Sequence, residues 1–122
     1  MAVLAIGMAT TMFLSCSKSD KLGNISELII GRWQLYESNA TDDPCDFEGW
    51  IEFKTDGTCT VFDACDDTTE TEQYTVNGKK ITITIDFISL PVIFTVVSIT
   101  DSKLVWRIDI LGNQITEKYK KI

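Results

Sequence analysis

Hydrophobic and polar side chains alternate with a period of two along most of this chain. Residues 79–87 show the pattern most clearly, with Ile81, Ile83 and Ile85 separated by threonines. Residues 103–110 repeat it, and their hydrophobic set is Leu104, Trp106, Ile108 and Ile110. Because successive side chains of a β-strand point to opposite faces, this alternation indicates strands with one face in a core and the other in water. We therefore expect an all-β protein.

Turn signals divide the chain after residue 30 into short segments of roughly 8 to 12 residues, a spacing typical of antiparallel strands. The strongest signal is Asn77-Gly78, since both residues tolerate the positive φ of a two-residue hairpin. Pro91 cannot donate a hydrogen bond to a neighbouring strand, so residues 89–91 are predicted to form a connection. The predicted strands are 31–38, 48–54, 58–64, 70–76, 79–87, 92–100, 103–110 and 113–121.

Eight short strands in consecutive hairpins favour a small antiparallel up-and-down β-barrel, because closure leaves no exposed sheet edge. A β-sandwich is the alternative. Before the first strand, residues 23–30 are predicted to form a short helix with Ile25, Leu28 and Ile29 on one face. We expect this face to cover one end of the barrel.

The N-terminus reads as a targeting segment. Residues 1–14 are uncharged and apolar, but shorter than the roughly 20 residues that a spanning helix needs. The following Phe13-Leu14-Ser15-Cys16-Ser17 resembles the lipobox at which bacterial lipoproteins are cleaved and acylated. An ordinary cleaved signal peptide, with Cys16 unmodified, is the alternative.

The lipobox resemblance implies a domain order and a location. We expect a signal peptide at 1–15, a lipidated Cys16 with a flexible polar tether at 16–24, and a β-barrel domain at 25–122. Acyl chains such as palmitate on Cys16 would hold the protein on a membrane. This places it in the cell envelope as an outer membrane lipoprotein, on either the periplasmic face or the cell surface.

Charge and composition exclude several functions. The net charge is −7, which repels a phosphate backbone, so nucleic acid is not an expected partner. The chain contains no histidine, which removes the commonest general base and the Ser-His and Cys-His nucleophile pairs. We therefore expect no enzymatic activity and no cofactor.

Three cysteines remain after Cys16, and they allow one intramolecular disulfide. Cys45 and Cys65 lie in turn-rich surroundings, whereas Cys59 lies in the middle of a predicted strand. We therefore favour Cys45–Cys65, with Cys45–Cys59 as the alternative. A zinc site is not expected, because there is no histidine and no C-x-x-C pair.

Acidic residues are dense around the third predicted turn, where carboxylates could hold Ca²⁺. They are Asp63, Asp66, Asp67, Glu70 and Glu72, joined by Asp42, Asp43 and Asp46 if a Cys45–Cys65 disulfide draws the two segments together. The D-x-D-x-D-G spacing of calcium loops is absent, so we predict solvated acidic loops and no metal site.

Four segments carry a resemblance to a known family. The Gly31-Arg32-Trp33 triplet resembles the G-x-W start of the first lipocalin strand. Together with residues 51–58, 74–81 and 94–99, it makes the chain similar to bacterial lipocalin-like domain lipoproteins. In lipocalins the first-strand tryptophan packs across the closed end and a late arginine covers it, so the resemblance assigns these roles to Trp33 and Arg107.

Five aromatic residues are candidates to contact a hydrophobic or ring-bearing ligand, namely Trp33, Trp50, Phe53, Phe94 and Trp106. Trp50 is distinct, because alternation with Ile51 and Phe53 inward leaves it pointing outward, near the barrel mouth.

Two functions are compatible with these features. The first is a membrane-tethered binding module that holds a small hydrophobic ligand in the open end of the barrel, which a ligand-sized cavity would support. The second is a protein-interaction or inhibitor module of the envelope. In that case the acidic loops 42–48 and 63–72 would meet a basic partner protein.

Overall fold

The computed structural model describes residues 24–85 and 89–122. The predicted signal peptide, Cys16 and all but the last residue of the tether lie outside these described residues. So do residues 86–87, at the end of the strand predicted at 79–87.

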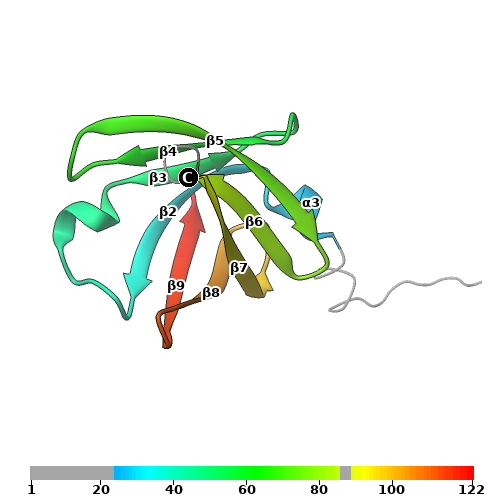
Figure 1. The fold of residues 1–122 in the computed structure, drawn as a ribbon. Coiled ribbons are helices and arrows are strands. Elements are labelled where there is room, and N and C mark those ends of the chain that lie inside the picture. Colours follow the sequence, from blue (N-terminus) through cyan, green and yellow to red (C-terminus); the bar gives the residue numbers. More distant parts are fainter. Residues whose placement is uncertain (1–23, 86–88) are drawn as a thin grey trace, which may run out of the picture.

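The described residues form eight antiparallel strands in one closed barrel (Figure 1). Each strand pairs with the next along the chain, and the last strand, β9, pairs with the first, β2. The strands are β2 (Gly31–Ser38), β3 (Trp50–Phe53), β4 (Thr58–Asp63), β5 (Thr68–Asn77), β6 (Lys80–Ile85), β7 (Leu90–Ile99), β8 (Lys103–Ile110) and β9 (Asn113–Lys121). The predicted up-and-down barrel is confirmed, and the β-sandwich alternative is wrong.

Two predicted strand boundaries were wrong. The 3-10 helix η2 (Pro44–Phe47) occupies the approach to β3, which begins at Trp50 rather than at residue 48. Pro91 lies within β7 rather than in a connection. The first half of β7 pairs with β6 alone, because its ladder with β8 begins only at Thr95. One side of this segment therefore needs no strand hydrogen bond, and a proline near the start of the strand is tolerated.

One end of the barrel is covered by the short helix α3 (Ile25–Leu28), as the hydrophobic face at 23–30 predicted. Ile25 and the following Ile29 are buried in the core, and Leu28 packs against it. In Figure 1, α3 lies at one end of the barrel and η2 lies at the other. We call these the closed end and the open end.

A bulge in β7 changes which side chains face the core. The register of β7 with β8 shifts between Val96 and Ser98, so Val97 is an extra residue and is 47% exposed. Strict alternation would have turned Ser98 inward after Val96, whereas the shift buries Ile99 instead. A similar register shift occurs in β2.

Candidate ligand-binding site

The closed end is built around the G-x-W motif. Trp33 is 0% exposed, and its Nε1 donates a hydrogen bond to the carbonyl oxygen of Ile29 at 2.7 Å. Lys121 lies opposite Trp33 in the β2–β9 ladder, with its Nζ 4.8 Å from the ring centroid. The same ammonium donates to the carbonyl oxygens of Ile30 at 2.9 Å and Leu28 at 3.4 Å. One lysine thus covers the tryptophan and binds one carbonyl at the end of α3 and one just after it.

The glycine of the motif is required by this arrangement. Gly31 has φ +129°, a value that residues with a side chain rarely adopt. A Cβ atom at this position would lie 3.0 Å from Cε of Lys121. The G-x-W spacing therefore leaves room for the cation that covers Trp33.

The assignment of Arg107 as the residue that covers Trp33 was wrong. Arg107 lies between the buried Trp106 and Ile108 in β8, so alternation turns its side chain outward. Its register partners are Thr95 and Thr116. Lys121 takes the role because the closure of the barrel, rather than position along the chain, sets which residue lies opposite Trp33.

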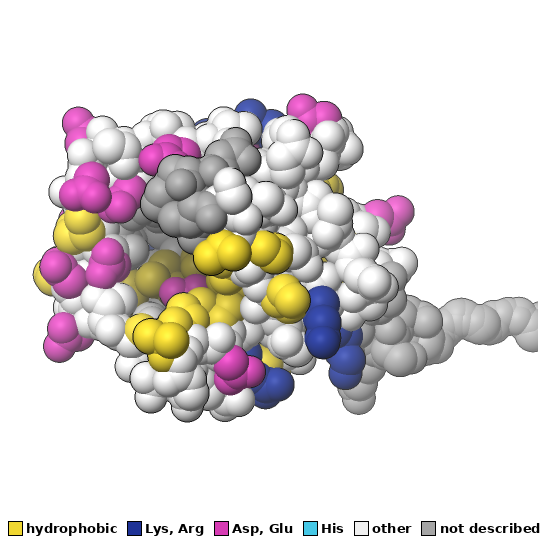
Figure 2. Space-filling model, viewed as in Figure 1, with side chains coloured by type: hydrophobic (Ala, Val, Ile, Leu, Met, Phe, Trp, Pro, Cys, Tyr) yellow, Lys and Arg dark blue, Asp and Glu magenta, His cyan; other side chains and the backbone are white. Residues whose placement is uncertain are grey.

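The open half of the barrel contains a cavity of about 380 Å³. This volume lies within the range of small-molecule sites, near its lower end. Its walls are mostly hydrophobic and include Leu35, Val61, Ile85, Val92, Phe94 and Ile108, contributed by five different strands. Figure 2 shows a hollow with hydrophobic side chains along it and acidic side chains within it and around it.

A polar group stands inside this hydrophobic cavity. Glu117, the fifth residue of β9, lines the cavity together with Trp106 and Tyr119. Its Oε1 accepts hydrogen bonds from Trp106 Nε1 at 2.8 Å and from the Tyr119 hydroxyl at 2.9 Å. Burial, and next the charge of Glu117, raise the pKa of Tyr119 well above its ordinary value. The hydroxyl therefore keeps its proton and remains a donor to Glu117.

Glu117 and Tyr119 were not among the residues predicted to contact a ligand. The signal was present in β9, where Ile115, Glu117, Tyr119 and Lys121 follow one another with a period of two. The hydrophobic members mark this face as inward, which leaves an acid and a lysine pointing into the barrel. An inward acid opposite an inward tryptophan is unusual enough to attract attention.

The five predicted ligand contacts occupy three different places. Phe94 and Trp106 line the cavity, with ring centroids 4.3 Å apart. Trp33 and Phe53 are buried in the core and are not among the residues that line the cavity. Trp50 borders the cavity mouth, but its ring packs outside on Phe62 and beneath the guanidinium of Arg32, 3.8 Å from the ring centroid.

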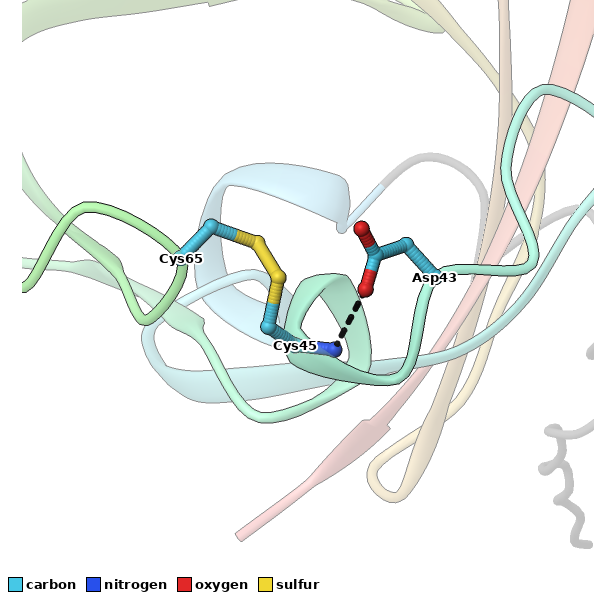
Figure 3. A group of neighbouring side chains, drawn as sticks. All are labelled: Asp43, Cys45 and Cys65. Carbon is cyan, nitrogen blue, oxygen red and sulfur yellow. Dashed lines mark hydrogen bonds between the residues drawn. A yellow bond between two sulfur atoms is a disulfide. The ribbon is translucent and has the colours of Figure 1, made fainter.

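A disulfide joins two segments at the open end. It connects Cys45 in η2 to Cys65 in the turn between β4 and β5, which is the pairing favoured from the sequence. Figure 3 shows Asp43 beside it, with a carboxylate oxygen that accepts a hydrogen bond from the Cys45 backbone N–H at 3.2 Å. The disulfide thus holds the acidic segments 42–48 and 63–72 next to each other at the mouth.

Asp43, Cys45 and Cys65 are also the one group of potential metal ligands that comes together in the described part of the chain. Both sulfurs are bonded to each other, so neither is a thiolate that could bind a metal ion. The remaining cysteine, Cys59, is buried.

The comparison with protein families agrees with this architecture. Residues 29–106, more than half of the chain, match the model of the lipocalin-like domain family. The chain belongs to this family. The lipocalin-like part of the resemblance inferred from the G-x-W segment and the three later motifs is confirmed, and the lipoprotein part stays a prediction. No curated protein matches the chain. Within the described residues of this lipocalin-like domain, no helix has the length and apolarity of a transmembrane span.

Proposed function

We propose that this lipocalin-like domain is a non-enzymatic binding module that holds a small hydrophobic ligand in the open end of its barrel. The observation that carries the proposal is the cavity of about 380 Å³ with hydrophobic walls. A barrel of this size can be filled completely by its own side chains, so an open interior is a specific feature and not a consequence of the fold.

Native mass spectrometry of the protein, purified gently from its own envelope, tests this proposal. We expect an adduct of small mass that is lost on denaturation. Val92→Trp should prevent adduct retention, because Val92 lines the cavity and a larger side chain would fill it. Ile93→Trp is the matched control, since Ile93 is the next residue of β7 and is 51% exposed. A bare mass for the wild-type protein would count against the carrier function.

We further propose that the domain is held in the cell envelope by lipid on Cys16, as an outer membrane lipoprotein. The sequence motif at residues 13–17 supports this. Intact-mass analysis of the membrane fraction should reveal a diacylglycerol thioether and an acylated amine on Cys16. Cys16→Ser should remove both and release the protein from the membrane, and an unmodified Cys16 in membrane-derived protein would contradict the anchor.

The second candidate function, a protein-interaction module, is favoured by a separate observation. The Cys45–Cys65 disulfide fixes two acidic segments side by side at the mouth, where a basic protein could bind them. Recovery of a partner from envelope extracts should then fall when the acids of segments 42–48 and 63–72 are neutralised. Unchanged recovery would argue against this function.

A further inference from the structure

The cavity of the proposed binding module contains a carboxylate with unused hydrogen-bonding capacity. An ionised carboxylate can accept about four hydrogen bonds through its two oxygens. Both bonds described for Glu117, from Trp106 and Tyr119, end on Oε1. No described residue donates a hydrogen bond to Oε2.

Oε2 is also accessible. Every buried side-chain nitrogen or oxygen among the described residues has a hydrogen-bond partner. Since Oε2 has none, it belongs to the atoms that solvent can reach, and Glu117 lines the cavity. A molecule inside the cavity could therefore contact Oε2 directly.

The charged residues that line the cavity, among those described, have one sign. Besides Glu117, its charged lining residues are Asp46 and Asp63, and no lysine or arginine belongs to the described lining. Fixed charges of one sign in a concave site with low-dielectric walls attract the opposite charge and repel their own. The cavity is thus unsuited to an anionic head group such as a fatty acid carboxylate.

We propose that the ligand is a cationic amphiphile, a hydrophobic chain or ring with a primary ammonium or guanidinium group that binds Oε2 of Glu117. This inference rests on the proposed binding function and specifies its ligand class. Ile85, Val92 and Ile108 provide the hydrophobic walls for the body of the ligand. The indole of Trp106 and the phenol of Tyr119, already fixed by their hydrogen bonds to Oε1, offer aromatic surface to the cation.

The test compares three probes with the same eight-carbon tail, octylamine, octanol and octanoate, by calorimetric titration into the purified full-length chain at neutral pH. We expect octylamine to bind best and octanoate worst, with at least about a tenfold difference in Kd between them, because only the amine forms a charge-assisted hydrogen bond with Glu117.

Glu117→Gln sharpens the comparison, since its amide oxygen can still accept from Trp106 and Tyr119. It should weaken octylamine binding by about tenfold and leave octanol binding nearly unchanged. Glu37→Gln is the matched control. It makes the same change in net charge, but Glu37 is exposed on β2 and pairs with Lys118, 3.1 Å away. Glu37→Gln should therefore leave the order of the three probes intact.

Two results would overturn the inference in different ways. Equal affinities of octylamine and octanol for the wild-type protein would refute the cationic ligand class and leave the binding module standing. Failure of all three probes to bind would refute the proposed function itself, and the inference with it. The order of the three probe affinities is measured on the wild-type protein, so it remains informative even if Glu117→Gln does not fold.

Discussion

The two ends of this barrel differ in how their polar groups are satisfied. At the closed end, the indole of Trp33, the ammonium of Lys121 and the carbonyls next to α3 bind one another, and Trp33 is 0% exposed. At the open end, Glu117 uses one carboxylate oxygen for its neighbours and leaves the other facing a cavity. The same strands therefore build a sealed core at one end and a hydrophobic cavity at the other.

Charge follows the same division. The loops of the open end carry Asp42, Asp43, Asp46, Asp66 and Asp67. The turns and strand ends of the closed end carry both signs, with Asp56 and Asp101 outnumbered by Lys54, Lys79, Lys80, Lys103 and Lys121. In Figure 2 acidic side chains gather mainly at the open end, on the left, and several basic side chains lie toward the closed end. The two ends thus differ in charge as well as in how their polar groups are satisfied.

Truncation of the closed-end tryptophan should give the largest effect. Trp33→Ala removes a fully buried ring and the hydrogen bond to Ile29, and should reduce the free energy of unfolding by about 3–5 kcal/mol. Urea denaturation measures this change. Trp50→Ala, at the cavity mouth, should cost about 1 kcal/mol. Equal losses from the two variants would contradict the division between the ends.

At the open end, the Cys45–Cys65 disulfide should contribute about as much to the free energy of unfolding as Trp33 does at the closed end. The double variant Cys45→Ser/Cys65→Ser opens a link between residues 20 positions apart, which should lower the free energy of unfolding by about 3 kcal/mol. Because the link lies far from the closed end, the NMR resonance of the Trp33 indole N–H in the native state should not change. A shifted Trp33 resonance would indicate that the two ends are coupled.

Stability at high pH should report on the burial of Cys59 in the core between the two ends. Burial, and next the charge of Glu72, raise the pKa of the Cys59 thiol from 9.0 to about 11. The unfolded chain loses this proton first, so the stability that Cys59 contributes is complete below pH 9 and is lost as the pH rises toward 11. We expect a loss on the order of 1 kcal/mol between pH 8 and pH 10.

The control for this experiment is Cys59→Ala, measured by urea denaturation over the same pH series. Its stability should change less over this range, with the remaining loss coming from tyrosines such as Tyr119, whose pKa is also raised by burial. Identical slopes for the wild type and the variant would show that the thiol is not the group responsible.

The smallest expected effect concerns the cation at the closed end. Lys121→Met should lower the free energy of unfolding by about 1 kcal/mol, because the ammonium binds two carbonyl oxygens and covers Trp33. Lys120→Met and Arg107→Met are controls on outward positions and should change stability by less than about 0.5 kcal/mol. A larger loss of unfolding free energy from Arg107→Met than from Lys121→Met would instead support Arg107 as the residue that covers Trp33.

Much of the fold could be predicted from the sequence because its signals are local. Alternation in residues 79–87 and 103–110 identified strands, Asn77-Gly78 identified a hairpin, and the hydrophobic face at 23–30 identified the covering helix. Each of these features depends on the backbone geometry of a few consecutive residues. The Cys45–Cys65 pairing was also predicted from local signals, because Cys59 lies within a predicted strand and the other two cysteines lie near turns.

The lining of the cavity was only partly predictable because it depends on residues that meet through barrel closure. Phe94 and Trp106 were expected to contact a ligand and line the cavity, whereas Glu117 and Tyr119 were missed. Their hydrogen bonds exist because β8 and β9 pair in the register that places Trp106 opposite Glu117.

The sequence by itself determined the strands, their order and the G-x-W closed end, since these follow from periodicity and short motifs. Only the tertiary structure decided that Lys121 rather than Arg107 covers Trp33, that a bulge at Val97 turns Ile99 inward, and that the open half is hollow. The physical reason is that register and bulges set which distant side chains meet, and a change of one residue reverses the facing of every side chain beyond it.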